Sequence, residues 1–246
     1  MAAETCLQLD VGNSSAKWRL LRDSEVTARG RYVHGDAASA EQMLACPAPT
    51  RIWVASVAPA QTEAGLASLL ESRWGVQPWF ARSERQTGAL QNSYADPERM
   101  GVDRWLAMLG ARARSSGRLC VVDAGSALTI DLVAASGRHE GGYIIPGPAL
   151  MERALLLDTG RVRFDEAADY ALDPGTGTAE AVRHGIALAQ TGAVALALER
   201  AGPERLQLYF CGGGGETLMR LLGRGGTLAP DLVFEGLAVM AGLRGN

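Results

Sequence analysis

A glycine turn near the start of the chain carries polar side chains suited to holding a phosphate. It reads Asp10-Val-Gly12-Asn13-Ser14-Ser-Ala-Lys17. Backbone N–H groups in such a turn form a concave nest for phosphate oxygens, and Lys17 adds a positive charge. Asp10 offers a carboxylate to a hydrated Mg²⁺, which binds through one or two carboxylates plus phosphate. A plain β-hairpin turn is the alternative, because Gly-Asn turns are frequent.

Lys17 is unusual in this composition, because it is the single lysine among 24 basic residues. All the others are arginine, so this chain uses arginine where a positive charge is sufficient. A compact, mobile ammonium group differs from a planar guanidinium in how it contacts a phosphate. Chance survival of one lysine is the alternative, and the functional interpretation is favoured.

A second turn of the same chemistry follows in the second half, as Asp123-Ala-Gly125-Ser126-Ala-Leu-Thr129. Ser126 offers a hydroxyl to a phosphate and Asp123 offers a carboxylate to a cation. Two such turns facing one another across a cleft are a much more specific signal than either turn alone.

The sequence Gly101-Val102-Asp103-Arg104 begins a predicted helix. Asp103 would accept a proton from an attacking hydroxyl, and Arg104 would hold an anionic substrate through its planar fork. Phosphoryl transfer requires little more than positioning, charge neutralisation and a base that orients the hydroxyl. The alternative is an acidic residue favoured by the helix dipole beside a solvated arginine.

Other site classes receive little support from the sequence. The glycines at 212–215 either let a flat adenine approach the backbone or form a flexible connection, since glycine permits both. No Walker loop and no Gly-x-Ser-x-Gly elbow occurs. The four cysteines are spaced too widely for a metal or redox pair, so we expect buried, reduced thiols.

Composition places the chain among globular proteins. It has 246 residues, 47% of them hydrophobic, with a net charge of −3. This charge gives no reason to expect a nucleic-acid partner. No uninterrupted apolar stretch is long enough to span a membrane and the start has no signal-peptide pattern, so we expect a soluble, cytoplasmic protein.

The order of predicted elements repeats. In each half an apolar strand ends in Asp-x-Gly and is followed by two strands and a helix. The repeat predicts an α/β fold of two homologous lobes, residues 1–116 and 117–246, with the ligand in the cleft between them. The predicted strands are the apolar residues that precede Gly12 and the segments 15–21, 25–33, 51–57, 76–80, 118–125, 128–134, 141–145 and 206–211. The predicted helices are 37–45, 59–74, 101–113, 146–157, 178–201, 216–222 and 234–243, with a long loop at 82–99.

Taken together, these residues resemble the type III pantothenate kinase family. The resemblance covers nearly the whole chain through five segments in order: 10–17, 101–104, 123–129, Gly141-Gly-Tyr-Ile-Ile-Pro-Gly147 and Thr178-Ala-Glu-Ala-Val182. It implies two ribonuclease-H-like lobes of the acetate and sugar kinase, heat-shock ATPase and actin superfamily. It also implies ATP-dependent phosphorylation of pantothenate, the first step of coenzyme A synthesis.

The resemblance implies roles for particular residues. Asp103 would be the proton acceptor, with Mg²⁺ at Asp10 and a monovalent cation, potassium or ammonium, at Asp123. The ATP phosphates would lie on Asp10, Val11, Gly12, Asn13, Ser14, Ser15, Ala16, Lys17 and Ser126. Pantothenate would contact Tyr94, Gly101, Val102, Asp103, Arg104 and Thr178. The family forms homodimers, and Thr178 would reach pantothenate from the second subunit; a plain helix N-cap is the alternative for this residue.

Two departures from the family pattern are conservative. Ser126 and Ser14 each stand where threonine is commoner, and both keep the hydroxyl. The resemblance leaves one non-enzymatic alternative, an accessory factor for a bacterial transcription regulator that retains the kinase fold. A sugar or acetate kinase is a further alternative, but the short chain and the Gly-x-Asp-Arg sequence argue against it.

Overall fold

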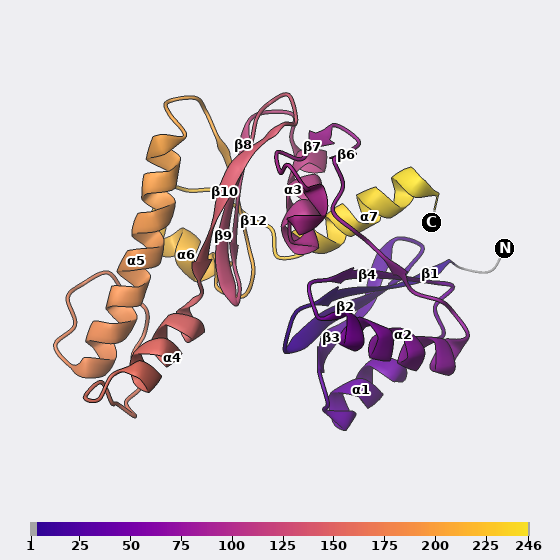
Figure 1. The fold of residues 1–246 in the computed structure, drawn as a ribbon, viewed down its shortest axis with the longest axis horizontal. Coiled ribbons are helices and arrows are strands. Elements are labelled where there is room, and N and C mark those ends of the chain that lie inside the picture. Colours follow the sequence, from indigo (N-terminus) through magenta and orange to yellow (C-terminus); the bar gives the residue numbers. More distant parts are fainter. Residues whose placement is uncertain (1–3, 246) are drawn as a thin grey trace. The chain divides into compact units, whose positions relative to one another are not determined.

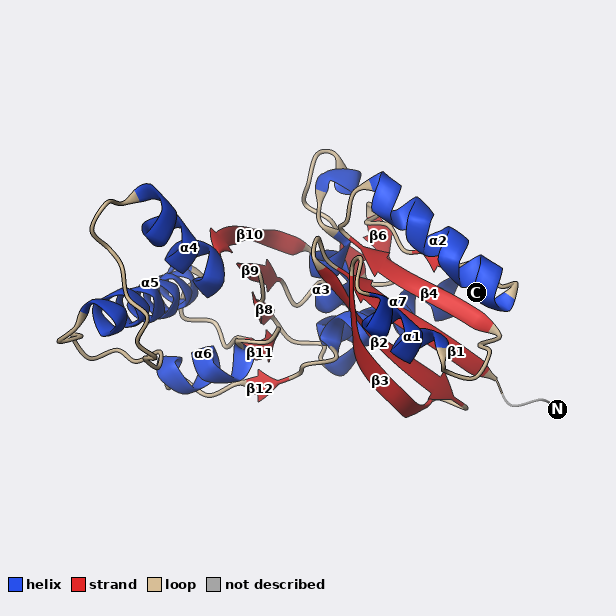
Figure 2. Ribbon diagram, turned by 90° about the horizontal axis from the view of Figure 1, so that it is seen from below, coloured by secondary structure: helices blue, strands red, loops and turns tan. Residues whose placement is uncertain are grey.

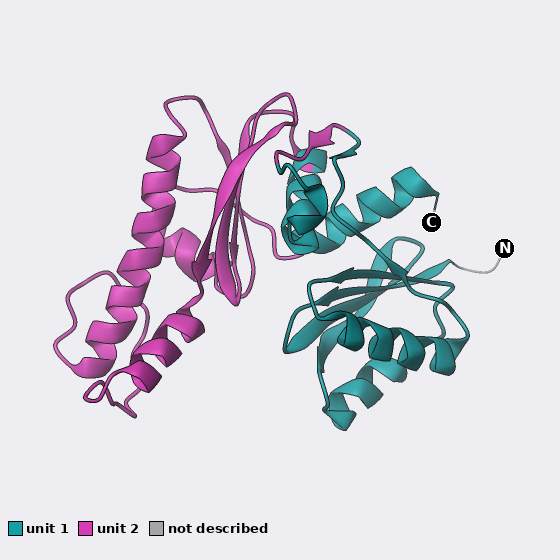
Figure 3. Cartoon of the chain, viewed as in Figure 1, with its two compact units in different colours: residues 1–88, 94–113, 232–246 teal, residues 89–93, 114–231 magenta. Residues whose placement is uncertain are grey.

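The computed structural model describes residues 4–245 and divides the chain into two compact units (Figure 3). Unit 1 contains the residues up to 88, residues 94–113 and the residues from 232 onward. Unit 2 contains residues 89–93 and 114–231. This division differs from the one drawn from the sequence repeat, because the last helix belongs to the first unit by its contacts. The lobe boundary at 116/117 therefore stays a prediction about the repeat.

Unit 1 is built on a five-stranded sheet in the order β3-β2-β1-β4-β5 (Figure 1). Its central strand β1 pairs antiparallel with β2 and parallel with β4. Side chains alternate between the two faces, so Leu7, Leu9 and Val11 of β1 enter the core. The strands are β1 Thr5–Val11, β2 Ser15–Arg22, β3 Glu25–Val33, β4 Arg51–Ser56 and β5 Trp79–Phe80.

Helices pack against both sides of this sheet. α1 (Ala37–Leu44) and α2 (Ala60–Trp74) give Met43, Leu66 and Leu70 to the same core as the apolar β1 residues. α7 (Leu232–Arg244) contacts β1 and β4, and it packs on α3 (Val102–Arg114). A Cβ atom on residue 236 would overlap the Leu106 carbonyl, so α3 and α7 approach through glycine.

The predicted long loop at 82–99 contains short regular pieces. It holds the two-residue strands β6 (Gln86–Thr87) and β7 (Leu90–Gln91) and a 3₁₀ helix at Pro97–Arg99. Strands this short have no periodicity that a sequence could reveal. The 3₁₀ helix ends at Arg99 and α3 begins at Val102, so the Gly101–Arg104 segment directly follows this loop.

Unit 2 repeats the sheet of unit 1 in the order β10-β9-β8-β11-β12 (Figure 2). Here β8 takes the place of β1, since it pairs antiparallel with β9 and parallel with β11. The predicted α/β fold with two similar halves is therefore confirmed. The strands are β8 Leu119–Ala124, β9 Ala127–Val133, β10 His139–Pro146, β11 Gln207–Cys211 and the unpredicted β12 Thr227–Leu228.

Three helices accompany the second sheet: α4 (Pro148–Asp158), α5 (Thr178–Arg200) and α6 (Gly215–Leu222). α5 and α6 give Val194, Leu198 and Leu218 to a core shared with β8, β9 and β11. Helix α4 has no fully buried residue. By length and composition, α5 is apolar enough to cross a membrane. The core helix of a soluble protein meets the same criterion, and 39% of the most apolar 18-residue stretch of α5 is buried.

The cysteines are free thiols in the part of the chain that the structure describes. Cys6, Cys120 and Cys211 are buried as expected, whereas Cys46 is partly exposed. Burial raises the pKa of both Cys6 and Cys120 to about 12. These thiols are therefore protonated at neutral pH and poor nucleophiles.

Candidate functional site

The first turn joins β1 to β2 and is closed by its own backbone. The Gly12 N–H donates to the Ser15 carbonyl at 2.9 Å, which leaves Asn13 and Ser14 exposed at the tip. The residue that follows β3 supports the turn, since a His34 ring nitrogen lies 2.9 Å from the Gly12 carbonyl. The predicted turn is therefore present, and its exposed tip leaves the polar side chains accessible to a ligand.

Asp10 and Lys17 are direct partners in the register of β1 and β2. Opposite residues in an antiparallel pair have Cβ atoms about 4.5–5.5 Å apart and lie on the same face of the sheet. Lys17 is exposed and Asp10 is half-buried. Arg31 is the partner of Lys17 on the other side, and its guanidinium donates to the Ser15 hydroxyl at 2.9 and 3.0 Å. One acidic and two basic groups thus flank the turn.

Val57 connects this turn to the beginning of α3. It follows β4, and its N–H donates to the Val11 carbonyl at 3.0 Å. A Cβ atom on Gly101 would lie 3.9 Å from its Cγ1. The carboxyl ends of the parallel strands β1 and β4 therefore meet the N-terminus of α3. Open α/β sheets commonly bind ligands at this edge.

Asp103 is in the first turn of α3, half-buried, with its carboxylate turned back along the chain. Its Oδ1 accepts the N–H of Arg104 at 2.8 Å. The same oxygen lies 2.6 Å from the position of a Cβ on residue 101, so Gly101 leaves the space that the carboxylate occupies. The helix N-terminus favours the ionised carboxylate, the form that accepts a proton.

Arg104 is buried, although its guanidinium reaches a tyrosine hydroxyl. Its Nη1 donates to the Tyr94 hydroxyl at 3.0 Å, and the guanidinium carbon lies 5.9 Å from the centre of that ring. The structure thus brings together Tyr94, Gly101, Asp103 and Arg104, as the predicted substrate set requires. Tyr94 thus holds the Arg104 guanidinium beside the start of α3.

The second turn joins β8 to β9 and is supported by two other segments of unit 2. Within it the Gly125 N–H donates to the Ala127 carbonyl at 2.9 Å. From outside, Gly147 donates to the Ser126 carbonyl at 3.0 Å and Gly214 donates to the Ala124 carbonyl at 2.9 Å. These bonds occupy backbone carbonyls, whereas the Ser126 side chain is exposed.

The end of β8 presents oxygen atoms that a side chain on residue 212 would cover. A Cβ atom there would overlap both the Asp123 carboxylate and the Ala124 carbonyl oxygen, and the backbone of Gly212 has φ of +78°. Carboxylate and carbonyl oxygens are the ligands that hard cations prefer. The Asp123 carboxylate therefore offers donor chemistry suited to a cation, while the Ala124 carbonyl already accepts the Gly214 N–H at 2.9 Å.

Thr178 is exposed at the first residue of α5 and is not the N-cap, which is Gly177. The N-cap alternative is thus wrong. The cap is stabilised by Glu180, whose carboxylate accepts both the N–H and the hydroxyl of Thr176 at 2.8 and 2.9 Å. These hydrogen bonds hold the pKa of Glu180 below its usual range. Thr178 lines an apolar groove of about 1140 Å³ between α4 and α5.

Several supporting residues were missed by the sequence analysis. Arg31 lies on β3 and His34 directly follows that strand, and neither has a recognisable spacing relative to the first turn. Gly147 was noted only as the end of a segment that resembles the family, although Pro-Gly between a strand and a helix does indicate a tight approach. Among the described residues no group of three or more His, Cys, Asp or Glu is placed to hold a metal. A cation held jointly by one carboxylate and a phosphate does not need such a group.

Comparison with known proteins identifies the family of this chain. The family model described as type III pantothenate kinase matches residues 6–200. A type III pantothenate kinase from Pseudomonas aeruginosa (strain LESB58) is 39% identical over 243 residues, covering 95% of this chain and 97% of the relative. One from Hahella chejuensis is 34% identical, covering 96% of each.

A solved structure supports the fold independently. A Baf family transcriptional activator from Campylobacter jejuni superposes with a TM-score of 0.62 at 21% identity, covering 98% of this chain and 99% of that one. At this identity the likeness concerns the fold alone.

Proposed function

Because the chain belongs to the type III pantothenate kinase family, we propose that it transfers the γ-phosphoryl group of ATP to the hydroxyl of pantothenate. The observation that carries this proposal is the arrangement of Asp103 and Arg104 at the start of α3. A carboxylate and a fixed guanidinium on adjacent residues suit a substrate that has both an alcohol and a carboxylate. The product, 4'-phosphopantothenate, enters coenzyme A synthesis.

Asp103 accepts the proton of the pantothenate hydroxyl as the new P–O bond forms and the bond to ADP breaks. Gly101 and the Arg104 N–H hold the carboxylate in one orientation, which reduces the reorganisation needed at the moment of transfer. Arg104 pairs with the pantothenate carboxylate, and Tyr94 keeps the guanidinium in place. Val102 is buried behind them and supports the helix start.

The two turns hold the phosphates of ATP. In the first, the N–H groups of the turn and the Lys17 ammonium bind phosphate oxygens, and Asp10 holds the Mg²⁺ that accompanies the nucleotide. In the second, Ser126 donates its hydroxyl. Mg²⁺ supplies charge neutralisation on the phosphates, while these residues fix the direction from which the γ-phosphoryl group is approached.

A monovalent cation, potassium or ammonium, completes the proposed site at Asp123. Support comes from the chemistry of the Asp123 carboxylate, an oxygen ligand at the end of β8 beside the second turn. A cation there would add positive charge near the phosphates that this turn would hold.

We also propose a homodimer, with Thr178 contributing to the pantothenate site of the second subunit. Unit 2 exposes large apolar side chains on β10 and α5, including Ile144 at 63%, Leu188 at 60% and Leu196 at 53%. Leu196 lines a hollow together with Tyr143 of β10, and exposed apolar side chains that gather in this way are typical of an interaction site. The α4–α5 groove, which Thr178 lines, belongs to the same unit.

An accessory role without catalysis is not favoured, because a protein that only binds a partner has no need to orient a carboxylate as Gly101 does here. A cytoplasmic location, without nucleic-acid or membrane partners, stays a prediction. An ADP-release assay with purified protein, ATP, Mg²⁺, potassium and pantothenate tests the activity. ADP formation that requires pantothenate is expected; its absence under all cation conditions would refute the kinase assignment.

A further inference from the structure

A small cavity adjoins the second turn within unit 2. Its volume is about 220 Å³, and Ala124 of β8 and Gly213 and Gly214 before α6 form part of its wall. Sites for drug-sized ligands are about 300–1000 Å³, so this cavity suits one flat ring system rather than a whole nucleotide. The remaining lining residues are Pro148, Tyr170, Ala187, Gln190, Thr217, Leu218 and Leu221.

Tyr170 is the aromatic residue of this lining, and it comes from the irregular segment 159–177. It also lines a second cavity, of about 530 Å³, between α4, α5 and the same segment. Burial raises the pKa of its hydroxyl, with a further contribution from Glu152, so the ring remains neutral. A neutral, half-buried ring at the wall of a small cavity is suited to stacking on a flat heterocycle.

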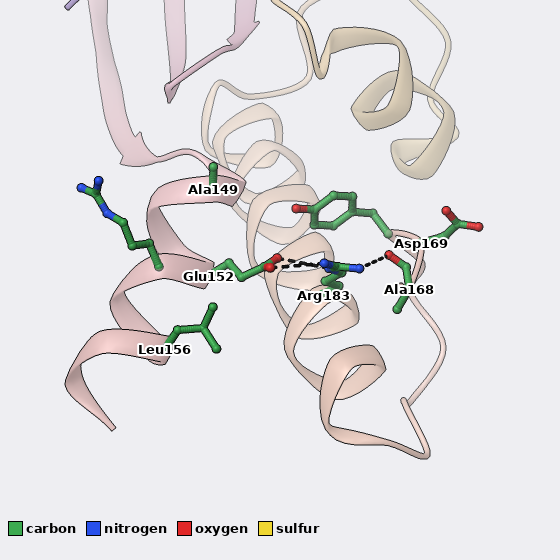
Figure 4. Close-up of a pocket in the computed structure, with 8 residues that line it drawn as sticks. Ala149, Glu152, Leu156, Ala168, Asp169 and Arg183 are labelled. Atoms are coloured by element: carbon green, nitrogen blue, oxygen red, sulfur yellow. Dashed lines mark hydrogen bonds and ion pairs between the residues drawn. The ribbon is translucent and has the colours of Figure 1, made fainter. Parts of the chain in front are cut away.

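Arg183 of α5 forms hydrogen bonds both to helix α4 and to the irregular segment 159–177 (Figure 4). Its Nε and Nη2 donate to the Glu152 carboxylate of α4 at 3.2 and 3.3 Å, and its Nη1 donates to the Ala168 carbonyl at 2.8 Å. The guanidinium carbon also lies 5.5 Å from the centre of the Phe164 ring. Helix α4 has no fully buried residue, so hydrophobic packing holds it only weakly. The ion pair between Arg183 and Glu152 links α4 to α5 instead. Tyr170 lies two residues after Ala168. The hydrogen bond from Arg183 to the Ala168 carbonyl therefore holds the backbone next to the tyrosine in place.

We propose that Tyr170 is a nucleotide-binding residue whose ring packs against the base of ATP in the 220 Å³ cavity, and that Arg183 is the positioning residue that holds it there. The proposal rests on the proposed function, because it takes the phosphates of the same ATP to lie on the second turn. It assigns a contact with the base to a segment without regular structure.

Calorimetric titration with Mg-ATP, and separately with Mg-tripolyphosphate, tests the proposal without requiring turnover. Tripolyphosphate has the phosphates but no base. Tyr170→Ala should raise the Kd for ATP by roughly 5-fold or more, the usual loss for an aromatic stacked on a base, and leave tripolyphosphate binding unchanged. Tyr170→Phe should restore most of the ATP affinity, since it keeps the ring.

Two further variants distinguish the loss of stacking between Tyr170 and the base from a loss of order in segment 159–177. Phe164→Ala alters the same segment but not the small cavity, so it should weaken ATP binding much less than Tyr170→Ala. Arg183→Met should weaken ATP binding and speed tryptic cleavage after Arg161 or Arg163. Unchanged ATP affinity in Tyr170→Ala, or an equal loss for ATP and tripolyphosphate, would overturn the proposal. Failure of the wild-type protein to phosphorylate pantothenate would instead contradict the proposed function.

Discussion

The Oδ1 atom of Asp103 lies 2.6 Å from the point where a Cβ atom on Gly101 would stand. The two residues therefore constrain one another: the absence of a side chain at 101 sets the orientation of the carboxylate at 103. The φ of Gly101 is not positive, so an alanine there is compatible with the backbone and would act through this contact alone.

Gly101→Ala should lower kcat while the protein stays folded. A displacement of about 1 Å in a catalytic group can cost 10²-fold, and the carboxylate must move by some such amount to escape the new methyl group. Steady-state kinetics and thermal melting of the variant check this. Gly65→Ala in α2 is the matched control, because a Cβ there meets no atom within 4 Å. A wild-type kcat in Gly101→Ala would contradict the idea that Gly101 sets the position of the Asp103 carboxylate.

Asp103→Asn should keep the fold and ATP binding and lose most turnover. Asparagine still accepts the Arg104 N–H through its carbonyl oxygen, but it cannot take the proton of the substrate hydroxyl. General base catalysis typically contributes about 10²- to 10⁴-fold. A loss in kcat of less than threefold would exclude Asp103 as the base.

Lys17→Arg should raise KM for ATP although the charge is kept. The site lies between Asp10 and Arg31 in the sheet register, so a planar guanidinium must fit where a compact ammonium now stands. Arg29→Lys, the same exchange in reverse on β3, is the control. If Lys17→Arg shows wild-type KM and kcat, the phosphate role of the lysine is wrong.

Activity should depend on a monovalent cation in addition to Mg²⁺. Dialysed protein assayed in lithium or sodium should turn over much more slowly than in potassium or ammonium, because the smaller ions match the Asp123 oxygens less well. Asp123→Asn should reduce this dependence along with the rate. Equal rates in all four cations would mean that protein donors alone satisfy the carboxylate.

Ile144→Glu should convert the proposed homodimer to a monomer and raise KM for pantothenate more than KM for ATP. The side chain is 63% exposed on β10, so the change has little reason to disturb the fold of one subunit. Sedimentation velocity gives the oligomeric state. A wild-type protein that sediments as a monomer yet is fully active at nanomolar concentration would contradict the shared site.

Local patterns in the sequence were sufficient for most of the architecture. Apolar runs, turn residues and the alternation at 25–33 located β1 to β4, and apolar strands ending in Asp-x-Gly revealed the repeated order of elements. What the sequence does not show depends on contacts between distant residues. The support of the second turn by Gly147 and Gly214 joins segments about 20 and 90 residues apart, and no local pattern records such bonds. Likewise, Arg183 and Glu152 look like ordinary surface charges on two helices until the intervening segment is seen to cross them.

The pairing of α7 with α3 has a consequence for how the protein is made. Unit 1 includes residues from 232 onward, whereas the whole of residues 114–231 belongs to unit 2. During synthesis the ribosome therefore releases the complete sequence of unit 2 before it releases the helix that covers the Asp103 segment. The Asp103 carboxylate would emerge early, and the side of its helix that packs on α7 would stay uncovered until residues 232–244 are released.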